Sequence, residues 1–426
     1  MTGGVNNMKI IRIAAALFSC AVLTAITGCG SSAKVKEQKK QVEISFSWWG
    51  NDARNKYTLE AIQKFERLHP EIKVDCNYSE WSGYEKRNKV WMISDTECDV
   101  MQINYGWLTD YSDDGKGYYK LRELTSSLDL SGYADDYLQY GTKGGVLNAL
   151  PIAMNAQTVY INKTIYDKFG VDVPKTWDDL FEAAKVMKES GVYPLSASSK
   201  SMWLYLIAYT EQKQGKKILA GDSALNFTPD DFAVMMDFYV QLVDKKVMPM
   251  VEHYERIKLD NEEYAGAVAW VSDAKSYFGS AVENGREIVL ADYTSTDGSG
   301  SGEGWYAKPA TMYAVSKNTV HPNEAGMLLD YLVNSSEMAE LQGIEKGIPL
   351  SSSVQGVLKE QGLLNGLQYD ASQKMDGCTL SELAPVLENG DLIDDFFSAC
   401  TDYIYGKTGL QDAANTFCAK AVKEYF

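Results

Sequence analysis

Residues 150–180 read LPIAMNAQTVYINKTIYDKFGVDVPKTWDDL, and this stretch decides the fold. It opens with Pro151 and continues as an apolar and β-branched segment that is interrupted by the amide of Asn155. The pattern becomes helical at Thr176. An extended segment with one polar side chain suits a crossing between two lobes, with that side chain facing the gap between them. A core strand with a satisfied Asn fits the composition equally well.

Length and composition indicate a globular protein of two domains. A chain of 426 residues is longer than an ordinary domain with a single hydrophobic core. Of these residues, 45% are hydrophobic and 23% are charged, as in globular proteins. The formal charge is −17. This acidic balance argues against a nucleic-acid surface and favours a neutral or cationic ligand over a phosphate.

The first 41 residues have the pattern of a processing segment. Lys9 and Arg12 precede an apolar run over residues 13–26, and Ile26-Thr27-Gly28-Cys29 resembles a lipobox. We expect a signal peptide over 1–28, lipidation of Cys29 and a charged linker over 29–41; the alternative is a lone cysteine after a cleaved signal. No later run approaches the roughly 18 apolar residues of a membrane helix, so the sequence predicts a lipid-anchored protein on the extracytoplasmic face.

The cysteines and histidines do not form a recognisable site. The seven cysteines are Cys20, Cys29, Cys76, Cys98, Cys378, Cys400 and Cys418. No pair has CxxC spacing, and the chain has three histidines, so we expect neither a metal nor another cofactor. Cys76 and Cys98 could pair, although buried free thiols fit the odd number better.

The N-terminal half of the chain alternates strands and helices. Strands are predicted over residues 42–50, 72–78 and 99–107, and helices over 51–68 and 84–93. This order indicates a doubly wound parallel sheet, whose ligands lie beyond the carboxyl ends of the strands. The residues at those ends that combine aromatic and polar character are Trp49, Asn51, Arg54, Glu80, Trp81, Asn104 and Trp107.

The next part of the chain predicts a second lobe. Thr176 and Thr228 each begin a helix with an acid three residues later, which is a capping box. The apolar run over residues 202–209 predicts a buried helix, where Trp203 could face either the core or a cleft. Residues 265–278 contain a buried strand that leads to Trp270 and Asp273. The Gly/Ser-rich residues 295–304 predict a surface loop.

Three motifs in the opening stretch resemble the bacterial extracellular solute-binding proteins that serve ABC sugar importers, the group that includes maltose-binding protein. They are Pro-Ile-Ala at 151–153, Tyr-x-Asn-Lys at 160–163 and Val-Pro-x-Thr-Trp-Asp-Asp-Leu at 173–180, and the resemblance extends over residues 42–426. It implies a two-lobed α/β fold in which each lobe is a doubly wound sheet with flanking helices. A multi-strand hinge would join an N-lobe of 42–153 plus 312–353 to a C-lobe of 154–311 plus 354–426. Residues 305–319 and 347–354 would form the second and third crossings.

The resemblance also implies a function. A monomer without a cofactor would capture a carbohydrate, with an oligosaccharide expected over a monosaccharide, by closing its lobes. An ABC permease in the membrane would recognise the closed form. Asn155 aligns with a ligand-contacting position at which maltose-binding protein has an acid. Sugar sites need flat aromatic faces and fixed polar groups. The candidate residues are Trp49, Asn51, Arg54, Glu80, Trp81, Asn104, Trp107, Asn155, Trp203, Trp270, Asp273 and Lys308.

Several alternatives stay open from the sequence. Arg54 could pair with Asp52 or fork across two hydroxyls, and Lys308 could support the hinge instead of the ligand. A different solute, such as a peptide, a polyamine or a glycerol phosphoester, would fit the same fold. A surface glycosidase would need Glu80 and Asp273 as a carboxylate pair, but no motif couples them. An adhesin would need repeats or an exposed interaction surface, and the sequence has neither.

Overall fold

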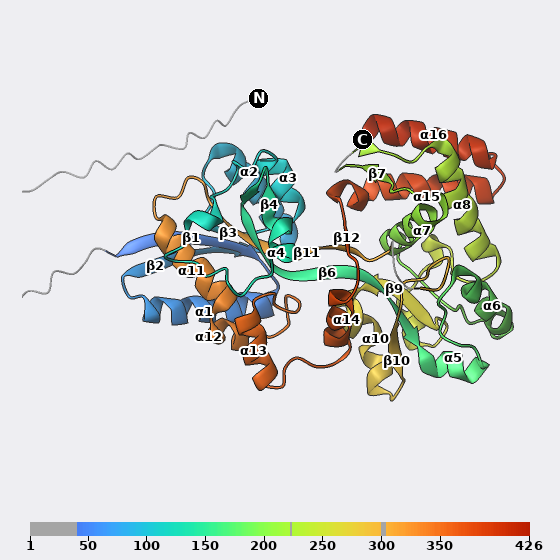
Figure 1. Cartoon of the computed structure of the whole chain (residues 1–426), viewed down its shortest axis with the longest axis horizontal. Coiled ribbons are helices and arrows are strands. Elements are labelled where there is room, and N and C mark those ends of the chain that lie inside the picture. The colour runs from blue at the N-terminus through green and yellow to red at the C-terminus, as the bar shows by residue number, and fades with distance from the viewer. Residues whose placement is uncertain (1–40, 222–223, 300–303) are drawn as a thin grey trace, which may run out of the picture. The chain divides into compact units, whose positions relative to one another are not determined.

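One long strand passes through two sheets of the protein. The computed structural model describes residues 41–221, 224–299 and 304–426, so the signal peptide, Cys29 and most of the linker lie outside the described residues. Strand β6, Ala149–Asn162, pairs along its first half with β11, Tyr306–Val315, and along its second half with β9 and β10. Figure 1 shows β6 and β11 running between two groups of helices and strands. The crossing predicted in the extended part of residues 150–180 is confirmed, and β6 gives its bounds.

The sheet of the first lobe has the strand order β2-β1-β3-β11-β6. Strands β1, β2 and β3 are parallel, as the alternating pattern predicts, while β11 runs antiparallel to both β3 and β6. The three parallel strands are Val42–Trp49, Ile72–Ser79 and Val100–Ile103. Alternate residues of β1 point into the core, where Phe46 and Trp48 stack with centroids 4.8 Å apart. Burial of these large rings is a main source of the stability of this lobe.

Helices cover this sheet, and the loops at the strand ends lead into them. Asn51 caps α1, since its side chain accepts a hydrogen bond from the Arg54 amide at 2.9 Å. The helices of the lobe are α1 Asp52–Leu68, α2 Trp81–Ser94, α3 Gly106–Ser112, α4 Asp135–Leu138, α11 Pro322–Asn334, α12 Ser336–Gln342 and α13 Ser352–Glu360. A short hairpin lies between α4 and β6, with strands Thr142–Lys143 and Val146–Leu147.

Helix α13 changes the expected lobe boundary at residue 353. Its Val354 and Leu358 pack in one cluster with Ala339 of α12, and the helix also contacts α11. An apolar helix face that is buried against first-lobe helices belongs to that lobe. We therefore propose that the chain returns to the second lobe after α13, between Gln361 and Gly366, and not within residues 347–354.

In the second lobe, β6 is flanked by β9, Gly266–Trp270, and β10, Ile288–Ala291, both antiparallel to it. Thr176 and Thr228 form the predicted capping boxes with Asp179 and Asp231. The helices here are α5 Lys163–Phe169, α6 Trp177–Met187, α7 Ser199–Gln214, α8 Pro229–Asp244, α9 Ile257–Asp260, α10 Ala274–Glu283, α14 Leu367–Asp376, α15 Gly390–Ile404 and α16 Leu410–Glu424. The remaining short strands are Leu219–Ala220, Ala224–Leu225 and Ser381–Glu382.

The five described cysteines are all unpaired. Cys98, Cys400 and Cys418 are buried, and Cys76 and Cys378 are partly buried. Burial raises the pKa of the Cys76 thiol to about 11. Because both thiols are unpaired, Cys76 and Cys98 do not form a disulfide in this structure. The two described lobes pack without one.

Candidate functional site

Three tryptophans from separate loops form one aromatic cluster at the strand ends of the first lobe. Trp49 ends β1, Trp81 begins α2, and Trp107 lies in α3. The rings of Trp81 and Trp107 are nearly parallel, at 16° and 5.8 Å between centroids, and Trp49 meets Trp81 edge-on at 5.0 Å. Trp107 is buried, whereas Trp81 is 37% exposed. The sequence predicts that these loops converge, and the structure brings them together.

A cavity of about 830 Å³ lies beside Trp49. Its walls come from the strand ends of the first lobe, from both crossing strands and from the second lobe. The lining residues are Trp49, Arg54, Gln102, Asn155, Ser272, Lys275, Ser276, Lys308, Ala310, Thr311, Ile344, Glu345, Lys346, Gly347 and Gln368. Four predicted site residues are among them: Trp49, Arg54, Asn155 and Lys308. This volume lies in the range of small-molecule sites.

Arg54 is positioned in the cavity wall by the segment after α12. Its Nε lies 3.3 Å from Glu345 Oε1, and its Nη2 donates to the Glu345 carbonyl at 3.0 Å. This pairing answers the question that the sequence leaves open, because the partner is Glu345 and not Asp52. Both groups are partly exposed, so the ion pair contributes little to stability and mainly orients the guanidinium.

Lys346 is a cavity residue that the sequence analysis missed. Its side chain is 5% exposed, and Nζ donates to Gln102 Oε1 at 3.1 Å and to the Tyr313 hydroxyl at 2.7 Å. Burial, with a smaller contribution from the charge of Arg54, lowers the pKa of Lys346 to about 7. The one available signal was Gln102, a polar residue in the otherwise apolar strand Val100–Ile103, and it did not identify its partner.

Asn155 joins the crossing strand to the second lobe. Its Nδ2 donates to Ser272 Oγ at 3.0 Å, and its Oδ1 accepts from the Ser272 amide at 3.1 Å. The amide is thus fixed in orientation at the cavity edge. Trp270, at the end of β9, lies under Lys308, whose Nζ is 5.4 Å from the ring centroid. Trp270 does not line the cavity itself.

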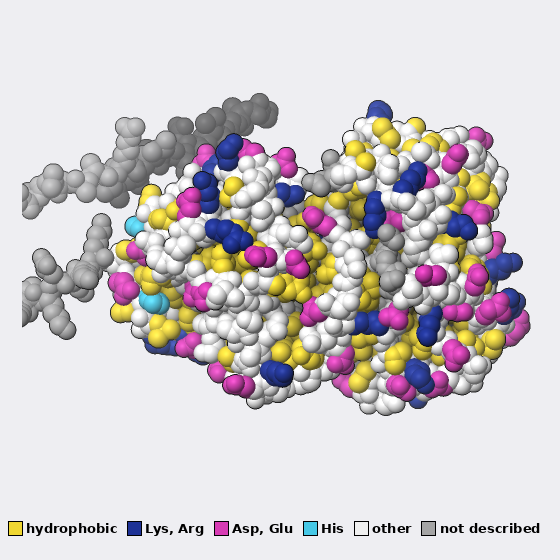
Figure 2. Space-filling view, in the orientation of Figure 1, with side chains coloured by type: hydrophobic (Ala, Val, Ile, Leu, Met, Phe, Trp, Pro, Cys, Tyr) yellow, Lys and Arg dark blue, Asp and Glu magenta, His cyan; other side chains and the backbone are white. Residues whose placement is uncertain are grey.

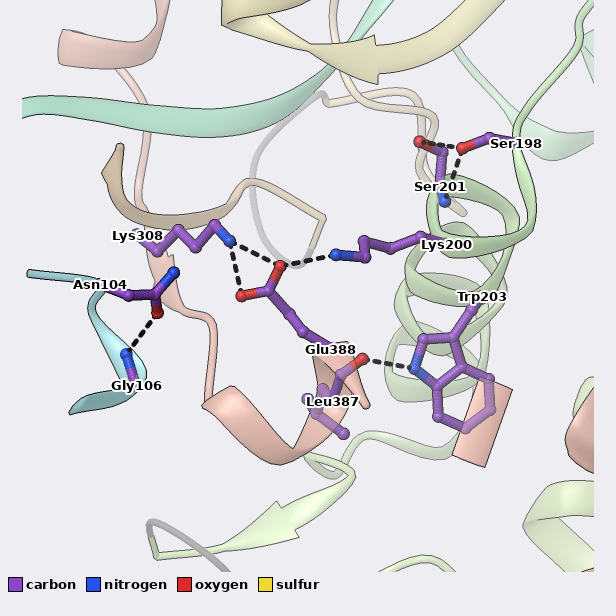
Figure 3. Close-up of polar contacts among 9 residues, drawn as sticks. All are labelled: Asn104, Gly106, Ser198, Lys200, Ser201, Trp203, Lys308, Leu387 and Glu388. Atoms are coloured by element: carbon purple, nitrogen blue, oxygen red, sulfur yellow. Dashed lines mark hydrogen bonds and ion pairs between the residues drawn. The ribbon is translucent and has the colours of Figure 1, made fainter. Parts of the chain in front are cut away.

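Lys308 belongs to an ion cluster that Figure 3 shows around Glu388. Its Nζ contacts both carboxylate oxygens of Glu388 at 2.6 Å, and Lys200 Nζ lies 3.0 Å from Oε1. Burial opposes ionisation of Glu388, but the charges of Lys308 and Lys200 outweigh it and lower the pKa of this carboxyl. Lys308 thus lines the cavity while its ammonium pairs with Glu388, and both roles considered from the sequence stay predictions.

The remaining predicted site residues lie elsewhere or have structural roles. Trp203 is only 1% exposed and donates from Nε1 to the Leu387 carbonyl at 3.1 Å, so it is a core residue (Figure 3). Asn104 accepts from the Gly106 amide at 2.9 Å and shapes the start of α3. Asp273 accepts from the Trp270 amide at 3.2 Å, and burial raises the pKa of its carboxyl. Glu80 is exposed at the start of α2, and neither acid lines the cavity.

The cavity is equipped for binding. It offers an indole face, one oriented amide, several cations and the hydroxyls of Ser272, Ser276 and Thr311. The described lining contains neither Cys nor His, and its single carboxylate, Glu345, is paired with Arg54. A hydrolytic pair of carboxylates is thus not assembled by the residues described at this cavity. In the described part of the chain, no helix is long and apolar enough to cross a membrane.

Comparison with known proteins identifies the family. Over 424 residues the chain is 22% identical to the multiple sugar-binding protein of Streptococcus mutans, covering 93% of this chain and 94% of that one. An uncharacterised ABC transporter extracellular-binding protein of Pyrococcus horikoshii is matched over 51% of its length at 24% identity. Among solved structures, a periplasmic oligogalacturonide-binding protein of Yersinia enterocolitica in complex with saturated digalacturonic acid superposes with a TM-score of 0.76 at 29% identity. That match covers 90% of this chain and 98% of the other.

A de novo designed cysteine esterase also shares the fold, with a TM-score of 0.82, 29% identity and the same coverage of 90% and 98%. The sequence profile of the bacterial extracellular solute-binding proteins matches residues 49–339, more than half of the chain. The two-lobed α/β fold, predicted from the sequence, is confirmed by these neighbours. The chain therefore belongs to the bacterial extracellular solute-binding protein family.

Proposed function

We propose that this protein is the extracytoplasmic substrate-binding component of an ABC importer, and that it captures a carbohydrate in the cavity beside Trp49. The observation that carries the proposal is the cavity wall itself. Trp49 presents a flat apolar face, while Asn155 and Arg54 present polar groups that their partners already hold in place. A sugar ring has an apolar face and a rim of hydroxyls, and this wall complements both.

Capture works by relative movement of the two lobes about the crossing strands. Trp49 and Arg54 belong to the first lobe, whereas Ser272, Lys275 and Gln368 belong to the second, and all of them line one cavity. A ligand that contacts both walls favours the arrangement in which the walls are close. The permease then distinguishes loaded from empty protein by that arrangement. The protein acts as a monomer, binds without turnover and is held at the membrane through Cys29.

The test is a thermal-shift screen of the purified protein against mono- and oligosaccharides, with peptides, polyamines and phosphoesters as controls. A ligand at a hundredfold excess over its Kd stabilises the folded state by about 2.7 kcal/mol. We expect stabilisation by one class of sugar and no release of product on prolonged incubation. A response confined to the control compounds would contradict carbohydrate capture, and release of sugar products would contradict binding without turnover.

A further inference from the structure

The charge of the cavity is opposite to the charge of the chain. The whole sequence carries a formal charge of −17, and acidic side chains are spread over the face drawn in Figure 2. In the cavity, however, four lining residues are basic and one is acidic. The basic residues are Arg54, Lys275, Lys308 and Lys346, and the acid is Glu345. The expectation of a neutral or cationic ligand, drawn from the total charge, does not describe this local surface.

Two of these cations already have carboxylate partners and two do not. Arg54 pairs with Glu345, and Lys308 pairs with Glu388. Lys275 is exposed and has no carboxylate partner within the described ranges. Lys346 contacts only neutral groups, the Gln102 amide and the Tyr313 hydroxyl. The cavity therefore contains two amines, those of Lys275 and Lys346, that no described carboxylate pairs with.

Lys346 is the stronger indication of the two. A buried ammonium without a counter-ion is costly, and the charge of another cation, Arg54, also lowers the pKa of Lys346. Its Nζ is fixed between β3 and β11 on the wall of a cavity wide enough for a ligand. An anionic group that enters the cavity would supply the missing counter-charge in a site shielded from water, where such a pair is strong.

We infer that the ligand is a carboxylate-bearing sugar, a uronic acid or its short oligomer, whose carboxylate pairs with Lys346 and Lys275 while Trp49 packs on a sugar ring. This inference rests on the proposed function and names its substrate class. The first turn of α10, with Ser272 just before it and Lys275 and Ser276 within it, lines the same wall and adds the positive end of the helix dipole. A small phosphoester would leave much of an 830 Å³ cavity and the indole face without a contact.

Carboxylate binding is then coupled to uptake of a proton. With the cavity empty, the lowered pKa of about 7 leaves Lys346 mostly neutral at pH 8. A bound carboxylate favours the ammonium and raises that pKa, so ligand binding at pH 8 takes up protons, and affinity falls as the pH rises above 7. The groups around Lys346 are Arg54 and Tyr57 of α1, Tyr313 of β11, and Glu345. Burial raises the pKa of Tyr57 and of Tyr313, so neither phenol competes in this range.

The experiment is calorimetric titration of the protein at pH 8 in two buffers of different ionisation enthalpy. The probes are digalacturonic acid, the neutral disaccharide of galactose, and glycerol 3-phosphate. We expect digalacturonic acid to bind at least about tenfold more tightly than the neutral disaccharide, with net uptake of protons. Equal affinity for the two disaccharides, or binding of glycerol 3-phosphate alone, would overturn the inference. If no carbohydrate of any kind binds, it is the proposed function that fails.

Variants separate the ligand role of Lys346 from a structural one. Lys346→Met keeps the length of the buried side chain and is expected to abolish proton uptake and the preference for the acidic sugar while neutral sugar still binds. Lys275→Met changes an exposed side chain, so it tests the same carboxylate contact even if the first variant unfolds; we expect a loss of about threefold to tenfold for the acidic sugar only. Lys64→Met, which changes a partly exposed lysine of α1 outside the cavity lining, is the matched control. Unchanged selectivity in both cavity variants would overturn the inference.

Discussion

The aromatic wall and the cationic wall of the cavity differ in how far apart in the sequence their residues lie. The aromatic wall is formed by Trp49, with Trp81 and Trp107 packed against it outside the lining. Each of these residues follows a predicted strand, so local pattern and the rule that parallel strands end at one edge set their positions. The cationic wall comes from residues far apart in the sequence. Lys346 meets Gln102 across 244 positions and Tyr313 across 33. Local pattern thus locates the aromatic wall and two of the basic residues, Arg54 and Lys308, and the folded chain adds Lys275 and Lys346.

Replacing Lys346 is expected to have the largest effect on stability, and the effect depends on pH. The folded-state pKa of about 7 lies below the ordinary value of 10.5, so between these values the unfolded chain binds more protons and stability rises with pH. Lys346→Met should therefore be more stable than the parent by about 1–4 kcal/mol near pH 6, and the difference should shrink toward pH 10. Urea unfolding at pH 6, 8 and 9.5 measures it. A difference that does not change with pH would show that the buried amine is not the cause.

The role of the aromatic wall in sugar binding can be tested by replacing Trp49 and Trp81 separately. Trp49 lines the cavity, whereas Trp81 packs against it from outside the lining. Trp49→Ala should weaken sugar binding by about 2 kcal/mol, or about thirtyfold in Kd, because an aromatic side chain at the centre of a contact carries much of its energy. Trp81→Ala is the matched control and should change Kd by less than about threefold. Equal losses in the two variants would mean that the ligand lies over the whole cluster.

The smallest expected effect concerns Lys308. Its ammonium either contributes to the cationic wall of the cavity or stabilises the crossing strand. Glu388→Gln removes the charge that Lys308 and Lys200 share, and it should lower stability at pH 7 by about 1 kcal/mol. The pKa of Glu388 is lowered in the folded protein, so its contribution is present above the ordinary value near 4.5 and is lost as the pH falls below it. Unfolding midpoints at pH 7 and pH 3.5 check this difference.

Sugar titration of the same variant completes the test. If Lys308 serves chiefly the strand, Glu388→Gln leaves the Kd for digalacturonic acid unchanged. A clear gain in affinity would place Lys308 in the cationic wall, with Glu388 as its competing anion.

Much of the fold could be predicted because its signals are local. The capping box of Thr176, the alternation in residues 42–49 and the apolar run that becomes β6 each act within a few residues. The boundary that we propose after α13 depends on the packing of Leu358 with Ala339 of another helix, and no local pattern encodes that contact. Trp203 shows the same limit at the site, since an apolar helix gives no sign of which face meets a cavity.

The ladder between β6 and β11 is irregular at the place where the chain crosses. Met154 faces Pro309, Ala153 faces Thr311, and Pro151 faces Met312, so each strand has one residue without a counterpart. Two prolines also remove backbone donors from this short stretch. The carbonyl of Ile152 is instead used by the Leu350 amide at 3.1 Å, from a third segment of the chain. The β6–β11 pair has few backbone hydrogen bonds over these two or three residue pairs, so it twists more easily than the regular sheets on either side. Mechanical compliance is therefore concentrated at the point that sets the width of the cavity.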